Sequence, residues 1–233
     1  MRSIVMTAGC SGCGTAAVTA AVARQMAGQG RRVLLAEATA GLRRMNALLG
    51  VREEGLFDLG DLLEGRGTLE NVLLPTHTAG LTLLQGPGAI DWVPDPAAVQ
   101  LLREELSGTE QYDVLLWYCP PGAGALQKGL LPAAETLVLL TDVTPQSIAA
   151  AVKTADWWAG QGAETQRVIF NRVGRRLPKD LGYPHLDAVL DAIGARLLGM
   201  IPEGADLPYS AAIGNIAARL CGEDRPLLAV YRP

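Results

Sequence analysis

Aromatic residues, histidines and long apolar runs are all scarce in this chain of 233 residues. Phe, Tyr and Trp together make up 5% of it, and there are two histidines. No apolar run reaches the roughly 18 residues that a membrane-spanning helix needs, and the start lacks the charged-then-apolar pattern of a signal peptide. Four cysteines do not suggest a disulfide framework in a chain of this length. These absences predict a cytoplasmic protein without a membrane span.

The chain also has no excess of positive charge. Its formal net charge is −4, which gives no electrostatic reason to expect nucleic acid as a partner. Hydrophobic residues make up 49% of it, enough to bury one large core. We therefore expect a single domain over residues 1–233.

Short apolar runs alternate with helical stretches along the chain. Their continuous apolar character indicates strands that are buried on both faces of a sheet. The expected strands are Ser3–Thr7, Arg32–Ala38, Leu81–Gln85, Asp113–Cys119, Thr136–Asp142, Arg167–Val173 and Leu197–Ile201. The expected helices are Thr15–Gly28, Asp58–Glu64, Asp95–Leu106, Pro145–Ala159, Leu186–Arg196 and Pro208–Cys221. This order predicts an α/β fold with a doubly wound, mostly parallel β-sheet flanked by helices.

The stretch between the first strand and the first helix has the frame of a phosphate-binding loop. Such a loop reads G-x-x-x-x-G-K-[ST], where the lysine holds phosphates and the hydroxyl holds magnesium. Gly9 and Gly14 keep the glycine spacing, but Thr15 stands at the lysine position and Ala16 at the hydroxyl position. Backbone N–H groups at this helix start would still point at an anion. The candidate ligand-binding residues are Gly9, Gly12, Cys13, Gly14, Thr15, Ala16 and Ala17.

Two further segments follow strand ends and therefore concern the same edge of the sheet. The loop from Gly86 to Pro96 either flanks the site or simply connects a strand to a helix. Arg43 and Arg44 follow the second strand, where they either touch a phosphate or a partner or lie in solvent. The sequence leaves both alternatives open.

Taken in order, these segments resemble the MinD/ParA family of deviant-Walker P-loop ATPases, and MinD more than ParA. The family's loop K-G-G-x-G-K-T-T corresponds to residues 10–17, its D-A-D-x-G-L-R strand end to 37–43, and its D-x-P-x-G segment to 118–122. The N-R-x strand end corresponds to residues 171–173 and the G-x-I-P-x-D/E loop to 199–203. The resemblance covers about residues 3–226 and implies the P-loop NTPase fold.

The departures from the family pattern fall on the residues that handle phosphate. The resemblance places Cys10 and Thr15 at the two loop lysines, and Ala16 at the magnesium ligand. It places Thr39 at the aspartate that orients the attacking water, and Tyr118 at the Walker B aspartate. Phosphoryl transfer depends on neutralising charge and positioning a nucleophile, so we do not expect hydrolysis by the usual route.

Binding of ATP or ADP stays open, because the part of the site that reads the base is better kept. The resemblance assigns adenine recognition to Asn171 and Arg172 at one strand end and to Pro202 and Glu203 in the covering loop. Asparagine at a strand end is also ordinary turn chemistry. The loop itself supplies no cation to meet a phosphate tail.

Cys10 and Cys13 form a C-x-x-C motif at the start of the first helix, where a thiol pKa is expected to fall. Cys119 ends the strand that we expect beside this loop. Three such cysteines could hold zinc or an iron–sulfur cluster, either alone or with ligands from a second chain across a dimer. The alternative is that small residues drifted into a loop freed from catalysis.

The first hypothesis is a catalytically inactive, MinD-like pseudo-ATPase that acts through protein contacts in positioning or cell division. Its partner would be a second copy or an active MinD/ParA-type relative, giving a homodimer or heterodimer. The alternatives are a divergent nucleotide-binding ATPase and a metal or redox protein. MinD ends in a basic amphipathic helix, whereas residues 227–233 are too short and weakly basic, so no direct membrane anchor is expected.

Overall fold

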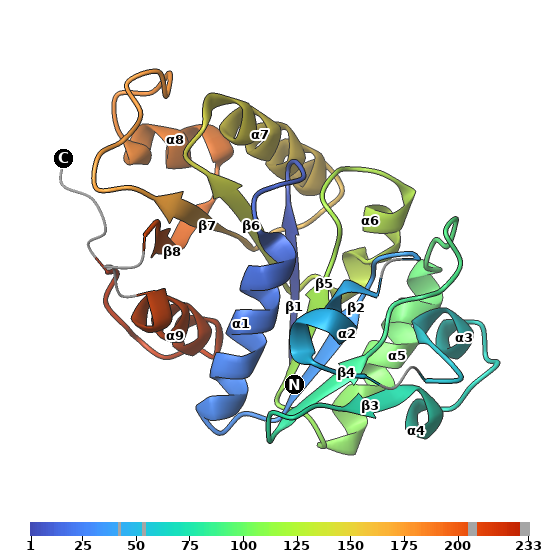
Figure 1. Cartoon of the computed structure of the whole chain (residues 1–233). Helices are drawn as coiled ribbons and strands as arrows, with labels where there is room; N and C mark the ends of the chain where they lie inside the picture. The colour runs from blue at the N-terminus through green and yellow to red at the C-terminus, as the bar shows by residue number, and fades with distance from the viewer. Residues whose placement is uncertain (42, 53–54, 205–208, 229–233) are drawn as a thin grey trace.

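One sheet organises the chain in the computed structural model, which describes residues 1–41, 43–52, 55–204 and 209–228. Within these ranges the sheet has eight strands in the order β3-β4-β2-β5-β1-β6-β7-β8 (Figure 1). Neighbouring strands are parallel except β3 and β4, which pair antiparallel at one edge. The strands are β1 (Arg2–Ala8), β2 (Val33–Glu37), β3 (Leu73–Pro75), β4 (Leu81–Leu84), β5 (Val114–Tyr118), β6 (Thr136–Asp142), β7 (Gln166–Val173) and β8 (Arg196–Pro202).

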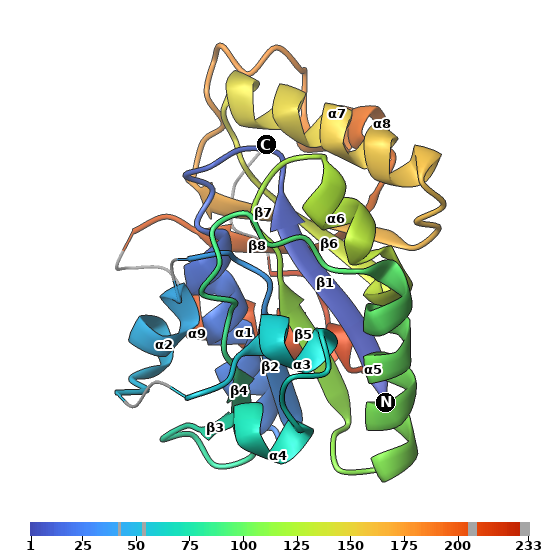
Figure 2. The ribbon, with the colours of Figure 1, turned by 90° about the vertical axis from the view of Figure 1, so that its right-hand side faces the viewer.

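Helices cover both faces of this sheet, as the two views in Figures 1 and 2 show. The helices are α1 (Thr15–Gly28), α2 (Arg44–Leu49), α3 (Leu59–Leu63), α4 (Leu69–Val72), α5 (Pro96–Thr109), α6 (Ala125–Gly129), α7 (Pro145–Gly160), α8 (Leu186–Ile193) and α9 (Tyr209–Leu220), with a 3₁₀ turn η1 (Leu131–Ala133). One apolar layer packs the sheet against α1, α2 and α9, and the other packs it against α3, α5, α7 and α8.

Successive side chains along each central strand enter opposite layers, as the strand period of two requires. In β5, Trp117 faces the layer of α5 and α7, while Leu116 and Tyr118 face the layer of α1. Both faces are apolar, which is why the sequence shows continuous runs rather than alternation.

The predicted fold class is confirmed, and all seven expected strands are present. Helix α8 ends earlier than expected, at Ile193 rather than Arg196, because Gly194 caps it with a left-handed φ of 69° and Arg196 opens β8. Five further elements were not expected from the sequence: β3, α2, α4, α6 and η1. These elements have three to six residues each, which is too short for a hydrophobic period to emerge.

Candidate functional site

The loop between β1 and α1 makes the sharp turn that its glycines predicted. Gly12 and Gly14 are left-handed, with φ of 92° and 85°, and Gly14 caps the start of α1. Gly9 has a different role, because a Cβ there would lie 2.3 Å from the backbone carbon of Ala150 in α7. Gly9 is therefore required by the close approach of the loop to α7.

This loop forms one wall of a cavity of about 500 Å³ at the carboxyl ends of β1, β2 and β5. All five positions at which the sequence departs from the family pattern line it. The described lining residues are Cys10, Ser11, Gly12, Gly14, Thr15, Ala16, Ala17, Thr39, Arg44, Leu48, Tyr118, Pro120 and Pro121. The predicted loop residues thus share one cavity, except Gly9 and Cys13, which do not line it.

Arg44 is the one charged residue among those that line the cavity in the described parts of the chain. It comes from α2, a helix that the sequence analysis did not predict. Its guanidinium has no hydrogen bond or ion pair with any described residue, whereas the neighbouring Arg43 lies 3.7 Å from the Asp58 carboxylate. The loop itself offers no cation, as expected, but α2 places one opposite it.

Glu37 fixes the start of α2 from beneath. Its carboxylate accepts hydrogen bonds from the backbone N–H groups of Arg44, at 2.7 Å, and Met45, at 3.1 Å. The residue is fully buried, and burial raises the pKa of this carboxyl although the two N–H groups and the nearby arginines act against the rise. Glu37 therefore positions Arg44 and does not itself line the cavity.

Tyr118 and Thr39 occupy the two positions that carry aspartates in the family pattern. Tyr118 is 2% exposed, and burial raises the pKa of its phenol, while Arg44 and the Thr39 hydroxyl lower it in part. The Thr39 hydroxyl lies near the phenol but completes no hydrogen bond within the described residues. Both positions are hydroxyls that stay neutral at neutral pH.

Asn171 and Arg172 hold the loop against β7. The Asn171 amide donates to the backbone carbonyl of Cys13 at 2.8 Å, and its Oδ1 accepts from the Arg172 N–H at 3.0 Å. Arg172 has a left-handed φ of 54°, and its guanidinium pairs with Asp142. Both polar groups of the Asn171 side chain are thus engaged inside the protein.

The second half of the predicted adenine site lies apart from the cavity. Pro202 is buried at the end of β8, and the N–H of Glu203 donates to the Val173 carbonyl at 3.0 Å. Neither Pro202 nor Glu203 lines the cavity, and nor do Asn171 and Arg172. The structure joins these four residues at the ends of β7 and β8.

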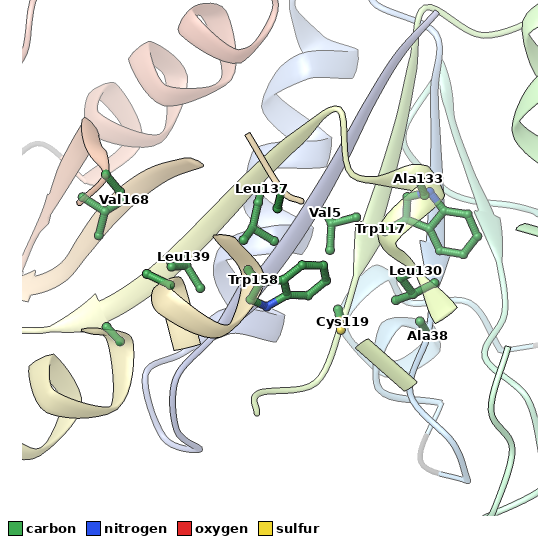
Figure 3. Close-up of a cluster of buried hydrophobic side chains, with 14 of the residues drawn as sticks. Val5, Ala38, Trp117, Cys119, Leu130, Ala133, Leu137, Leu139, Trp158 and Val168 are labelled. Carbon is green, nitrogen blue, oxygen red and sulfur yellow. The ribbon is translucent and has the colours of Figure 1, made fainter. Parts of the chain in front are cut away.

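The three-cysteine metal site predicted from Cys10, Cys13 and Cys119 is wrong. Cys119 points away from the loop and lies in the opposite apolar layer, beside Val5, Trp117 and Trp158 (Figure 3). It follows Tyr118, and Tyr118 faces the loop, so the strand period turns Cys119 to the other side. No described group of three or more Cys, His, Asp or Glu residues is suited to a metal ion.

The pKa values of the Cys13 and Cys119 thiols are raised, whereas a lowered thiol pKa was expected at the start of α1. Burial raises the pKa of Cys119 to about 12. Burial raises the pKa of Cys13 as well, with a further rise from the neighbouring Cys10. The start of α1 therefore does not make Cys13 a ready thiolate, and within one chain the three cysteines do not meet around a metal ion.

Two remaining expectations concern the loop from Gly86 to Pro96 and the C-terminal part of the chain. The loop from Gly86 to Pro96 runs along the end of β2, where the Gly41 N–H donates to the Pro87 carbonyl at 2.9 Å, but it does not line the cavity. Among the described helices, none is long and apolar enough to cross a membrane. The start of the last helix at Pro208 and residues 229–233 of the tail lie outside the described residues.

Known proteins of one kind resemble this chain along almost its whole length. Septum site-determining protein MinD of Bacillus subtilis is 25% identical over 97% of this chain and 91% of its own. MinD of Synechocystis is 27% identical over 97% and 92% of the two chains. A MinC:MinD cell division protein complex from Aquifex aeolicus contains a chain with 27% identity and a TM-score of 0.86, covering 99% of this chain and all of that one. No family model matches the sequence.

Proposed function

Because the chain belongs to the MinD/ParA family of positioning and cell-division proteins, we propose that it is a member that binds partners without hydrolysing ATP. The observation that carries this proposal is the lining of the cavity. Five positions that handle phosphate, magnesium and water in the family pattern meet there, and they hold Cys10, Thr15, Ala16, Thr39 and Tyr118.

Magnesium prefers oxygen ligands, usually one or two carboxylates together with substrate phosphates. Among the described residues that line the cavity, no side chain is a carboxylate and none is a lysine. The donors present are neutral hydroxyls, so the residues do not fit the family's magnesium ion. Without the metal and the lysines, the charge that develops during phosphoryl transfer is left largely unneutralised.

The test is phosphate release from millimolar ATP, with and without magnesium, beside an active MinD as positive control. We expect no release above the protein-free blank. Ser11→Glu adds a negative charge to the exposed loop and should change nothing, because there is no turnover to lose. Magnesium-dependent turnover that Ser11→Glu abolishes would overturn the proposal.

The partner would be a second copy or an active relative, and Ile90 marks a surface for it. Its side chain is 87% exposed and packs over the turn at Gly41, beside the segment that carries Thr39 and Arg44 into the cavity. Val93 in the same loop is 51% exposed, so this loop presents two apolar side chains to solvent. One of the solved relatives is a complex with a protein partner, which supports this choice.

Sedimentation velocity of the chain, alone and mixed with an active MinD, tests the contact. Ile90→Asp should reduce association at least about tenfold, since it places a charge in an apolar contact. Leu101→Asp is the matched control, because Leu101 is a comparably exposed apolar residue, 65% exposed on α5. Equal effects of both changes, or a monomer in every mixture, would contradict the surface.

Arg44 favours a second candidate function, which is binding of a nucleotide or another phosphate compound without magnesium. Arg44 lines the same cavity as the start of α1, and its guanidinium has no ion pair with a described residue. A helix start favours anions, and arginine binds phosphate oxygens in a bidentate manner. Calorimetry with ADP and ATP, with and without magnesium, tests it. Arg44→Gln should weaken binding roughly tenfold, about 1.4 kcal/mol, and the exposed Arg176→Gln should not. No heat at millimolar nucleotide removes this candidate and leaves the first untouched.

A further inference from the structure

The two sulfur atoms of the C-x-x-C motif lie next to each other in the loop. The Sγ atoms of Cys10 and Cys13 are 3.5 Å apart, and no other cysteine shares their neighbourhood in the described parts of the chain. We propose that Cys10 and Cys13 form a reversible disulfide, which makes the loop a modification site for a low-molecular-weight disulfide such as oxidised glutathione. This inference is independent of whether the cavity binds nucleotide.

The two thiols differ in access, which assigns them different roles. Cys10 is partly exposed and lines the cavity, so a small oxidant reaches it from solvent. Cys13 is 1% exposed and lies directly behind it. Cys10 is therefore the thiol that reacts first with a disulfide from solvent, and Cys13 is the resolving thiol.

Ser147 of α7 holds both sulfur atoms in place. Its hydroxyl lies 3.5 Å from the Cys10 Sγ and 3.8 Å from the Cys13 Sγ. Burial and the charge of Asp142 disfavour the Cys13 thiolate, whereas a hydrogen bond with Ser147 favours it. Cys13 therefore stays a thiol at rest and reacts when a partner sulfur is presented at contact distance.

The reaction balances as a thiol–disulfide exchange. The Cys10 thiolate attacks one sulfur of oxidised glutathione, forms a mixed disulfide and releases one glutathione thiolate. The Cys13 sulfur then attacks Cys10, forms the internal disulfide and releases the second glutathione thiolate. The protein loses two electrons and two protons, and one oxidised glutathione becomes two reduced molecules.

The loop can accommodate this bond with a local movement. A disulfide has an S–S distance of about 2.05 Å, so the sulfur atoms must approach by about 1.5 Å. They are separated by Ser11 and Gly12, and Gly12 has a φ of 92° with open space where a Cβ would lie. The movement stays outside regular secondary structure, and it shifts the wall of the cavity that Cys10 forms.

Peptide mass spectrometry of the full-length chain after tryptic digestion tests the proposal directly. Incubation with oxidised glutathione, followed by alkylation and trypsin, should yield the peptide of residues 3–24 about 2 Da lighter and unalkylated. That peptide carries Cys10 and Cys13 alone, because the flanking cleavage sites are Arg2 and Arg24. Dithiothreitol should restore both free thiols.

Single variants separate the two roles. Cys13→Ser should accumulate a stable glutathione adduct on Cys10, because the resolving thiol is gone, and Cys10→Ser should form no adduct. Cys13→Ala replaces Cys13→Ser if the serine variant does not fold. Cys221→Ser is the matched control, since Cys221 is partly exposed elsewhere, and it should leave the oxidation of peptide 3–24 unchanged.

Two results would overturn the proposal. One is a peptide 3–24 that keeps both free thiols while Cys221 reacts. The other is a glutathione adduct on Cys10 that is as stable in the wild-type chain as in Cys13→Ser. In that case Cys13 would not displace glutathione from Cys10.

Discussion

Replacing Asn171 with alanine is expected to destabilise the protein by about 2–4 kcal/mol in the absence of any ligand. The Asn171 side chain is 7% exposed and donates to the Cys13 carbonyl at 2.8 Å, which ties β7 to the loop. Its Oδ1 also accepts from the N–H of Arg172, a residue with a left-handed φ of 54°. Alanine removes both hydrogen bonds and leaves a buried carbonyl without a partner, at about 1–3 kcal/mol.

Asn46 provides a control of the same type and burial. It is also 7% exposed, but neither its Nδ2 nor its Oδ1 has a hydrogen-bond partner within the described residues. Asn46→Ala therefore removes packing and two unpaired polar groups, and should cost about 0–1 kcal/mol. The difference between the two variants isolates the hydrogen bonds of Asn171.

Urea unfolding followed by circular dichroism measures both changes. Asn171→Ala should also lower the melting temperature by roughly 4–16 °C, given about 2–4 °C per kcal/mol for a chain of this size. If the two variants are destabilised equally, within about 0.5 kcal/mol, the hydrogen bonds of Asn171 do not hold the loop. The side chain would then be free to contact a nucleotide base, as the family resemblance first implied.

Gly9→Ala should destabilise the protein by about 3 kcal/mol or more, because the new Cβ would meet the backbone of α7 at Ala150. Thermal unfolding measures this change. Gly28→Ala is the control, because a Cβ there has open space and the variant should be neutral or slightly stabilised. The pKa of Glu37 is raised by burial, so its contribution to stability is present below the unfolded-state pKa near 4.5 and is lost as pH rises through the folded-state pKa. Denaturation of wild type and Glu37→Gln across pH 4–8 should therefore show that the stability of the variant relative to wild type increases as pH rises. Parallel stability curves would contradict this. Asp113 shows the opposite sign: hydrogen bonds from Arg32 hold its pKa at about 2, so carboxyl chemical shifts should titrate there, and the small stabilisation should be lost as pH falls through that value.

The sequence predicted the strands of the sheet well because each central strand is apolar on both faces. This pattern can be recognised in each segment alone, without knowing which strands lie beside it. It could not predict β3 or α2, since three to six residues are too few for a period to show. Because the sequence did not predict α2, it also did not predict how the two arginines beside the cavity are placed. Arg43 and Arg44 are adjacent in the sequence, and only the start of α2, fixed by buried Glu37, decides that Arg44 faces the cavity while Arg43 lies near Asp58.

The cysteines also separate what the sequence determines from what only the tertiary structure decides. The sequence by itself determined the glycine turn, the C-x-x-C spacing and the absence of lysine from the loop, because these are local properties of consecutive residues. Only the tertiary structure decided that Cys119 faces the opposite layer and that Cys10 and Cys13 are left as a pair, 3.5 Å apart. It also decided that all five substituted positions share one cavity. Proximity between segments far apart in the chain is set by strand order and by the side to which each side chain points, and neither is encoded in any one segment.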